Sequence, residues 1–96
     1  MDVLSMVNEW FKSQCNGDWE HDYGITIQTL DNPGWSVDIY LYETELEDKP
    51  FKEINIYHSD MDWISCKVEN YFFKGMGDVN KLEQILNIFV QWQTEK

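Results

Sequence analysis

The stretch ITIQTLDNPGWSVDIYLY, residues 25–42, decides the fold of this 96-residue chain. Apolar residues occupy every second position before its Asn32-Pro33-Gly34 sequence, from Tyr23 to Ile27, and after it, from Trp35 to Leu41. An alternation with a period of two predicts half-buried strands. The proline fixes the first central position of a turn, and we expect the following glycine to adopt a positive φ. Two strands joined by one turn predict an antiparallel hairpin.

More strands follow the hairpin. Residues 53–57 and 63–68 predict a third and a fourth strand, because their apolar residues alternate in the same way. Residues 71–73 predict a short fifth strand, which Gly75-Met76-Gly77 is expected to end. Residues 43–50 predict an acidic loop that ends at a proline. A simple meander would place the apolar side chains of all these strands on one face of a sheet.

A helix is predicted before the strands. Asp2 is a good N-cap, and apolar residues recur at helical spacing between Val3 and Phe11. Leu4 belongs to this apolar stripe. Asn16-Gly17 supplies the left-handed residue that commonly follows a helix.

A second helix is predicted after the strands. Asp78 or Asn80 is expected to cap it, and Asn80 with Glu83 resembles a capping box. Its apolar stripe runs from Leu82 to Trp92. We therefore expect a single α+β domain over residues 1–96. It would have an antiparallel sheet of about five strands, bracketed by an N-terminal and a C-terminal helix that pack on one face.

The composition restricts the partners and the compartment. The chain has 18 acidic residues, seven lysines and no arginine, which gives a net charge of −11. This charge disfavours nucleic acid and anionic membranes. It either attracts a basic protein partner or only keeps the protein soluble, and charge alone does not separate these two interpretations. The chain has no apolar run long enough to span a bilayer and no visible secretory signal. Two cysteines without CxxC spacing suit a reducing environment, so we expect a cytoplasmic protein.

Candidate catalytic and metal-binding groups are few. His21, His58, Cys15 and Cys66 are scattered without the spacing of a zinc site, so we expect neither a metal nor another cofactor. Cys66 is expected to point inward between apolar neighbours, which makes a thiol inert. The alternative functions are a small enzyme that uses Cys66 as a thiol or the Glu20–His21 pair, and a homodimeric structural protein.

The outward face of the predicted sheet carries the best candidates for binding. If the alternation holds, this face contains Asp38, Tyr40, Tyr42, Tyr57 and Trp63. Both helices lie on the other face, so we expect these aromatic rings to form an exposed, contiguous patch. Tyr and Trp supply binding energy at protein interfaces, and carboxylates orient the partner. The alternatives are that a long loop or a homodimer covers this face.

Two stretches resemble the bacterial immunity protein 53 family. They are QCNGDWEHDYG at residues 14–24 and TLDNPGW at residues 29–35, supported by the helix with Trp10 and by Asp62-Trp63-Ile64. The resemblance implies a cytoplasmic antidote that is encoded beside the toxin of a polymorphic toxin system and binds it. It implies no mechanism and no mapped interface.

The residues of these stretches divide into two groups. Turn geometry and core packing account for Gly24, Pro33, Gly34 and Trp35. The remaining group, Trp19, Glu20 and His21, is predicted to lie in a loop with no assigned structural task. Conspicuous residues in a loop without a structural task favour binding, so these three are added to the candidate toxin-binding residues.

Overall fold

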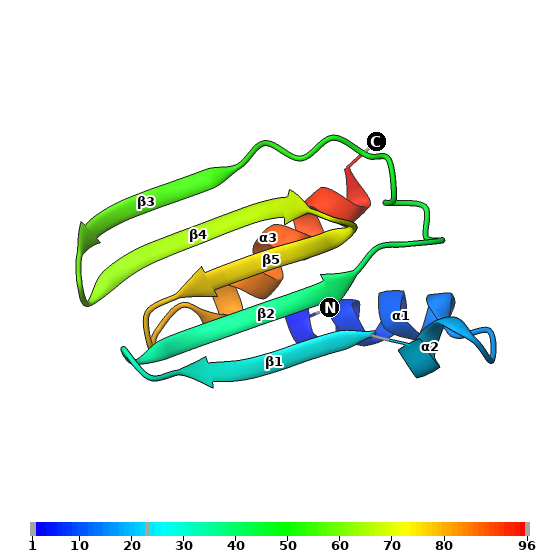
Figure 1. Cartoon of the computed structure of the whole chain (residues 1–96), viewed down its shortest axis with the longest axis horizontal. Coiled ribbons are helices and arrows are strands. Elements are labelled where there is room, and N and C mark those ends of the chain that lie inside the picture. The colour runs from blue at the N-terminus through cyan, green and yellow to red at the C-terminus, as the bar shows by residue number, and fades with distance from the viewer. Residues whose placement is uncertain (1, 23, 96) are drawn as a thin grey trace.

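The computed structural model describes residues 2–22 and 24–95, which form five strands and three helices (Figure 1). In chain order they are α1 (Val3–Gln14), α2 (Trp19–Asp22), β1 (Ile25–Leu30), β2 (Gly34–Tyr40), β3 (Ile54–Ser59), β4 (Asp62–Glu69), β5 (Phe72–Gly77) and α3 (Leu82–Thr94). Tyr23, which the alternation assigned to the first strand, lies outside the described residues. None of the helices in the described part of the chain has both the length and the apolar character needed to cross a membrane.

The five strands form one antiparallel sheet in the order β1-β2-β5-β4-β3. The helices lie on one face of it, which confirms the predicted α+β class (Figure 1). The expected meander is wrong, because β5 lies between β2 and β4. After β2 the chain crosses one end of the sheet through residues 41–53 and begins β3 at the far edge. The acidic loop is therefore a crossover connection.

The predicted hairpin is confirmed, with Ile25 opposite Ile39 and the turn at residues 31–33. The expected positive φ at Gly34 is wrong: the Asn32–Pro33 peptide is cis, and Gly34 already belongs to β2. A Cβ atom at Gly34 would lie 2.3 Å from the carbonyl oxygen of Gly77. Glycine is required there because two strands approach closely, and not because a turn needs a left-handed residue.

The predicted end of the fifth strand at Gly75-Met76-Gly77 is wrong, because β5 continues through this sequence. A Cβ atom at Gly75 would lie 2.3 Å from Cγ2 of Ile85 in α3. The glycine lets α3 approach the middle of the sheet. Glycine inside a strand often marks such a close approach. Gly75 therefore indicates close packing against α3 and not the end of a strand.

The N-terminal helix begins as predicted. Oδ1 of Asp2 accepts a hydrogen bond from the amide of Ser5 at 2.7 Å, which is an N-cap contact. Gly17 has a φ of +98° just beyond the end of α1, as expected for a residue that follows a helix. Val7 is buried, whereas Leu4, predicted to share its apolar stripe, is 58% exposed.

The predicted cap of the C-terminal helix is wrong. The residue before α3 is Lys81, which is already in the right-handed helical region and makes no side-chain cap. Asp78 begins the turn before the helix instead, because its carbonyl accepts the amide of Lys81 at 3.1 Å. The Asp78 carboxylate accepts the amide of Asn80 at 2.8 Å, so the capping box of Asn80 and Glu83 does not form.

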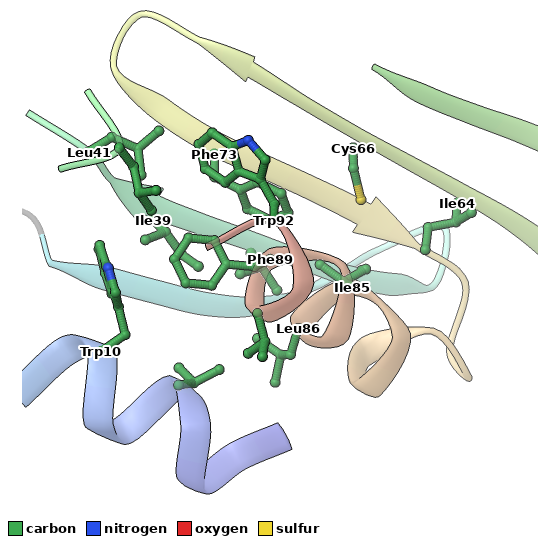
Figure 2. Packing of buried hydrophobic residues seen from close by; sticks show 14 of the residues in the cluster. Trp10, Ile39, Leu41, Ile64, Cys66, Phe73, Ile85, Leu86, Phe89 and Trp92 are labelled. Atoms are coloured by element: carbon green, nitrogen blue, oxygen red, sulfur yellow. The ribbon is translucent and has the colours of Figure 1, made fainter. Parts of the chain in front are cut away.

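The core lies between α3 and the central strands β2 and β5, with α1 packed beside α3 (Figure 2). Phe89 lies at its centre, with ring centroids 5.0 Å from Trp10 and 5.3 Å from Phe73. Because the helices cover mainly the central strands, Ile27 on β1 and Ile56 on β3 remain exposed, although they were predicted to face the core. None of the helices formed by the described residues lies on the opposite face of the sheet.

Candidate functional site

The face of the sheet opposite the helices carries the residues predicted for it. Asp38 and Tyr40 alternate with buried residues of β2, and Tyr42 follows that strand. Tyr57 on β3 is paired with Trp63 on β4. Register places all of them except Tyr42 on one face, because side chains alternate along every strand.

The aromatic residues of this face form two separate groups, so the predicted contiguous patch is wrong. Trp63 and Tyr57 lie at the end of the sheet where β4 begins, whereas Tyr40 lies at the end where β4 finishes. The six residue steps along β4 from Trp63 to Glu69 separate the two ends by about 20 Å. Their pairing positions therefore exclude direct contact between the groups.

Four rings form the group that we call the tyrosine cluster: Tyr40, Tyr42, Tyr71 and Phe72. The ring centroids of Tyr40 lie 5.1 Å from Phe72 and 6.0 Å from Tyr42, and those of Tyr42 and Tyr71 are 5.3 Å apart. Tyr42 and Tyr71 are 41% and 51% exposed. The sequence prediction did not include Tyr71 or Phe72, and it wrongly placed Tyr71 inside the fifth strand, which begins at Phe72. Asn70, a residue that tolerates left-handed backbone, was the available signal for a turn there.

The second group holds Tyr57 and Trp63. Tyr57 is 67% exposed, and its hydroxyl donates a hydrogen bond to Asp60, which raises the pKa of Tyr57. Trp63 is half-buried, and its backbone amide donates to Oδ2 of Asp78 at 2.9 Å. This group therefore lies beside the connection that leads into α3.

Lysines occupy the middle of the face between the two groups. Lys67 and Lys74 stand directly opposite each other on β4 and β5, and Asp38 is opposite Lys74 on the other side. Lys67 forms an ion pair with Glu69 at 3.0 Å. The hydrogen bond in this pair raises the pKa of Lys67 and lowers that of Glu69. The centre of the face has mixed charge, although the chain is strongly acidic.

The prediction of a loop at residues 19–21 is wrong for all three residues, and the prediction that they have no structural task is wrong for Trp19 and Glu20. They belong to α2, and Trp19 is 4% exposed, with its ring centroid 5.8 Å from that of Trp10. The carboxylate of Glu20 accepts the amides of Asn16 at 2.9 Å and Gly17 at 2.8 Å. A hydrogen bond from its own amide and these two bonds lower the pKa of Glu20. His21 is exposed.

The acidic loop also has a structural task. Glu45 accepts hydrogen bonds from Nε1 of Trp10 at 2.7 Å and from Nε2 of Gln14 at 2.8 Å. Glu47 accepts the amide of Glu43 at 3.1 Å. The loop therefore fastens α1 to the end of the sheet, in addition to placing carboxylates in solvent.

No catalytic arrangement is found among the described residues. Cys66 is fully buried, and burial raises its pKa to about 12, so the thiolate that a nucleophile requires is strongly disfavoured. Cys15 is exposed at the end of α1. Within residues 2–22 and 24–95, no group of three or more His, Cys, Asp and Glu side chains could hold a metal ion.

The groove between α1 and β1 offers no catalytic pair either. Its lining consists of Leu4, Val7, Asn8, Phe11, Glu20, Gly24, Ile25 and Ile27. Glu20 is the ionisable residue of this lining, and both of its carboxylate oxygens accept backbone amides. The groove is therefore an apolar gap beside an edge strand.

Comparison with known proteins identifies a family. The family model for immunity protein 53 matches residues 4–94, nearly the whole chain. No curated protein and no solved structure matches this chain. The family match agrees with the resemblance carried by residues 14–24 and 29–35.

Proposed function

Because the chain belongs to the immunity protein 53 family, we propose that it binds and neutralises the cognate toxin of a bacterial polymorphic toxin system. It acts by stoichiometric protein–protein binding in the cytoplasm, and not as an enzyme. The family membership supports the role of an immunity protein, and the identity of the toxin follows from the partner gene.

The observation that carries this proposal is the sheet face without a helix. Asp38, Tyr40, Tyr42, Tyr57 and Trp63 belong to the toxin-binding surface in this reading, together with the exposed His21 at the end of α2. Exposed Tyr and Trp rings are typical anchors of protein interfaces. Trp19 and Glu20, the other two candidates, make structural contacts, since Trp19 packs in the core and Glu20 binds backbone amides.

The charge of the chain supports a basic toxin. A protein with a net charge of −11 attracts a cationic partner, which raises the rate of encounter. The same charge repels nucleic acid and anionic lipid. The association rate should therefore fall as salt screens the attraction.

Two rival functions make different demands. A thiol-dependent enzyme needs an accessible thiolate, and Cys66 is buried with a raised pKa. A structural homodimer needs the uncovered face to bind a second copy of the chain. Sedimentation of the isolated protein distinguishes this reading, because a homodimer has twice the mass of the 11.5 kDa chain.

The test uses the toxin domain encoded by the neighbouring gene. Co-expression of this chain should protect cells from the active toxin, and the purified chain should bind a catalytically inactivated toxin in a one-to-one complex. Calorimetry of the Tyr40→Ala and Trp63→Ala double variant should give a weaker complex. Absence of protection and of binding would refute the proposed function. Retention of wild-type affinity by the double variant would refute the interface alone.

A further inference from the structure

Backbone strain gathers at one end of the sheet. Among the described residues other than glycine, Glu43, Asn70 and Tyr71 have positive φ values, of 62°, 52° and 68°. Asn70 and Tyr71 form the two-residue turn between β4 and β5, and Glu43 follows β2. The amide of Leu41 donates to the carbonyl of Tyr71 at 2.7 Å, so the two strained segments touch each other.

A tyrosine is an unusual residue for this turn. Two-residue hairpin turns with positive φ at both positions favour Asn followed by Gly, and Asn70 fits the first position. Tyr71 occupies the second position, where a side chain carries a steric cost. Its ring is half exposed and lies edge to face against the exposed ring of Tyr42. Strained residues that expose a large side chain point to binding.

Acidic residues are concentrated in the segments at the same end of the sheet as the tyrosine cluster. Residues 15–22, 41–48 and 69–72 lie together at the end of the sheet that includes α2 and the turn between β4 and β5 (Figure 1). These segments contain eight of the 18 acidic residues and none of the seven lysines. The opposite group, Tyr57 and Trp63, lies instead near Lys81, which pairs with Asp62 at 2.9 Å and Asp78 at 2.7 Å. The segments at the tyrosine cluster therefore contain no cation, whereas Lys81 offsets part of the negative charge near Tyr57 and Trp63.

We propose that the tyrosine cluster is the docking site for the toxin, and that it takes a basic, arginine-bearing segment of the toxin surface. This inference rests on the proposed function. Guanidinium groups stack on the exposed rings of Tyr42 and Tyr71, because arginine binds aromatic faces well. The carboxylates of the adjoining loops pair with the flanking cations. Tyr57 and Trp63, about 20 Å away, belong to the wider toxin-binding surface but lie outside this docking site, and they contribute less to the affinity.

The decisive measurement is the affinity of variants for the inactivated toxin domain encoded by the neighbouring gene. The Tyr42→Ala and Tyr71→Gly double variant should bind at least about 30-fold more weakly, the loss typical of interface hot spots. Tyr71→Phe retains the ring and should stay within about threefold of the wild type. Met61→Ala is the control, because Met61 is an exposed apolar residue in the turn between β3 and β4, and it should change affinity less than about twofold.

Charge variants test the chemistry of the partner. Glu43→Gln with Asp48→Gln removes two carboxylates near the cluster and should slow association and weaken its salt dependence. Asp31→Asn with Asp60→Asn removes the same charge at the opposite end and should slow association less. Equal effects of the two pairs would overturn the basic-segment proposal.

The outcomes separate this inference from the proposed function. If the wild-type chain neither binds the toxin domain nor protects cells, the function itself fails. If the wild-type chain binds but the cluster variant keeps its affinity, the function stands and the docking site is wrong. Circular dichroism and the melting temperature of each variant show that a loss of affinity does not come from unfolding.

Discussion

Nε1 of Trp10 donates a hydrogen bond to Glu45 at 2.7 Å, across 35 residues of sequence. This bond connects the buried Trp10 side chain of α1 to the acidic crossover loop. Truncation in Glu45→Ala leaves the indole without its acceptor, so we expect a loss of about 1–2 kcal/mol in the free energy of unfolding. Urea unfolding followed by tryptophan fluorescence measures it.

Asp48 provides the control for this variant, because it is an exposed acid of the same loop. Asp48→Ala should change the free energy of unfolding by less than about 0.5 kcal/mol. Glu45→Gln keeps a side-chain acceptor and should recover most of the loss. Equal stability of Glu45→Ala and Asp48→Ala would show that the loop does not fasten α1.

The stability of the protein in acid should depend on Asp78. The Lys81 ammonium and the amides of Asn80 and Trp63 donate to this carboxylate and lower its pKa to about 2. In the unfolded chain the pKa is about 3.9, so folding favours the charged form. The stabilisation is complete above about pH 4 and is lost as the pH falls towards 2.

Asp78→Asn removes this titration. The difference between its urea midpoints at pH 7 and pH 3 should be smaller than in the wild type, while part of the acid sensitivity remains because the pKa values of Asp2, Glu20 and Glu69 are also lowered. Asp31→Asn, in the exposed turn between β1 and β2, serves as the control. The same acid sensitivity in Asp78→Asn and the wild type would contradict the assignment.

The contact between Gly75 and Ile85 should make β5 intolerant of any side chain at position 75. Gly75→Ala forces its Cβ atom against the branched side chain of Ile85, and we expect a cost of about 1–3 kcal/mol. Met76→Ala, on the opposite face of the same strand, should cost less. In a double-mutant cycle, Ile85→Ala should recover part of the cost of Gly75→Ala. Additive losses would exclude a clash between these two residues.

The elements of this fold were predictable wherever local pattern decides them. The hairpin around residues 25–42 and the Asp2 cap follow from alternation and from turn and cap chemistry. The strand order was not predictable, because the position of β5 between β2 and β4 depends on long-range pairing that alternation does not encode. The glycines of β5 were misinterpreted for the same reason: their neighbour Ile85 lies in another element.

The candidate site shows the same division. Alternation correctly placed Tyr40, Tyr57 and Trp63 on one face. It could not predict that Tyr40 lies at the opposite end of that face from Tyr57 and Trp63, because this depends on the pairing of β2, β5 and β4. The place of Tyr71 in the tyrosine cluster could be predicted only by recognising the two-residue turn with positive φ at Asn70 and Tyr71. The burial of Trp19 depended on its packing against Trp10, which only the tertiary structure brings near.

The two cysteines should differ in reactivity. Cys66 is buried with a raised pKa, whereas Cys15 is exposed. An aromatic disulfide reagent at pH 8 should label one thiol per native chain rapidly, and both after denaturation. Cys15→Ser should remove the rapid phase, and Cys66→Ser should leave it. Rapid labelling of native Cys15→Ser would restore the thiol-dependent enzyme as a candidate.

The left-handed backbone of Tyr71 predicts that its replacement by glycine does not harm the fold. Tyr71→Gly relieves the steric cost of a positive φ but makes the unfolded chain more flexible and removes the ring contact with Tyr42. We expect the free energy of unfolding to stay level or to rise by up to about 1 kcal/mol, as measured by urea unfolding. Tyr71→Ala keeps the strain without the ring and should be the less stable variant. If Tyr71→Gly instead lost more than Tyr71→Ala, the ring would be stabilising the turn, and its exposure would need no binding partner to explain it.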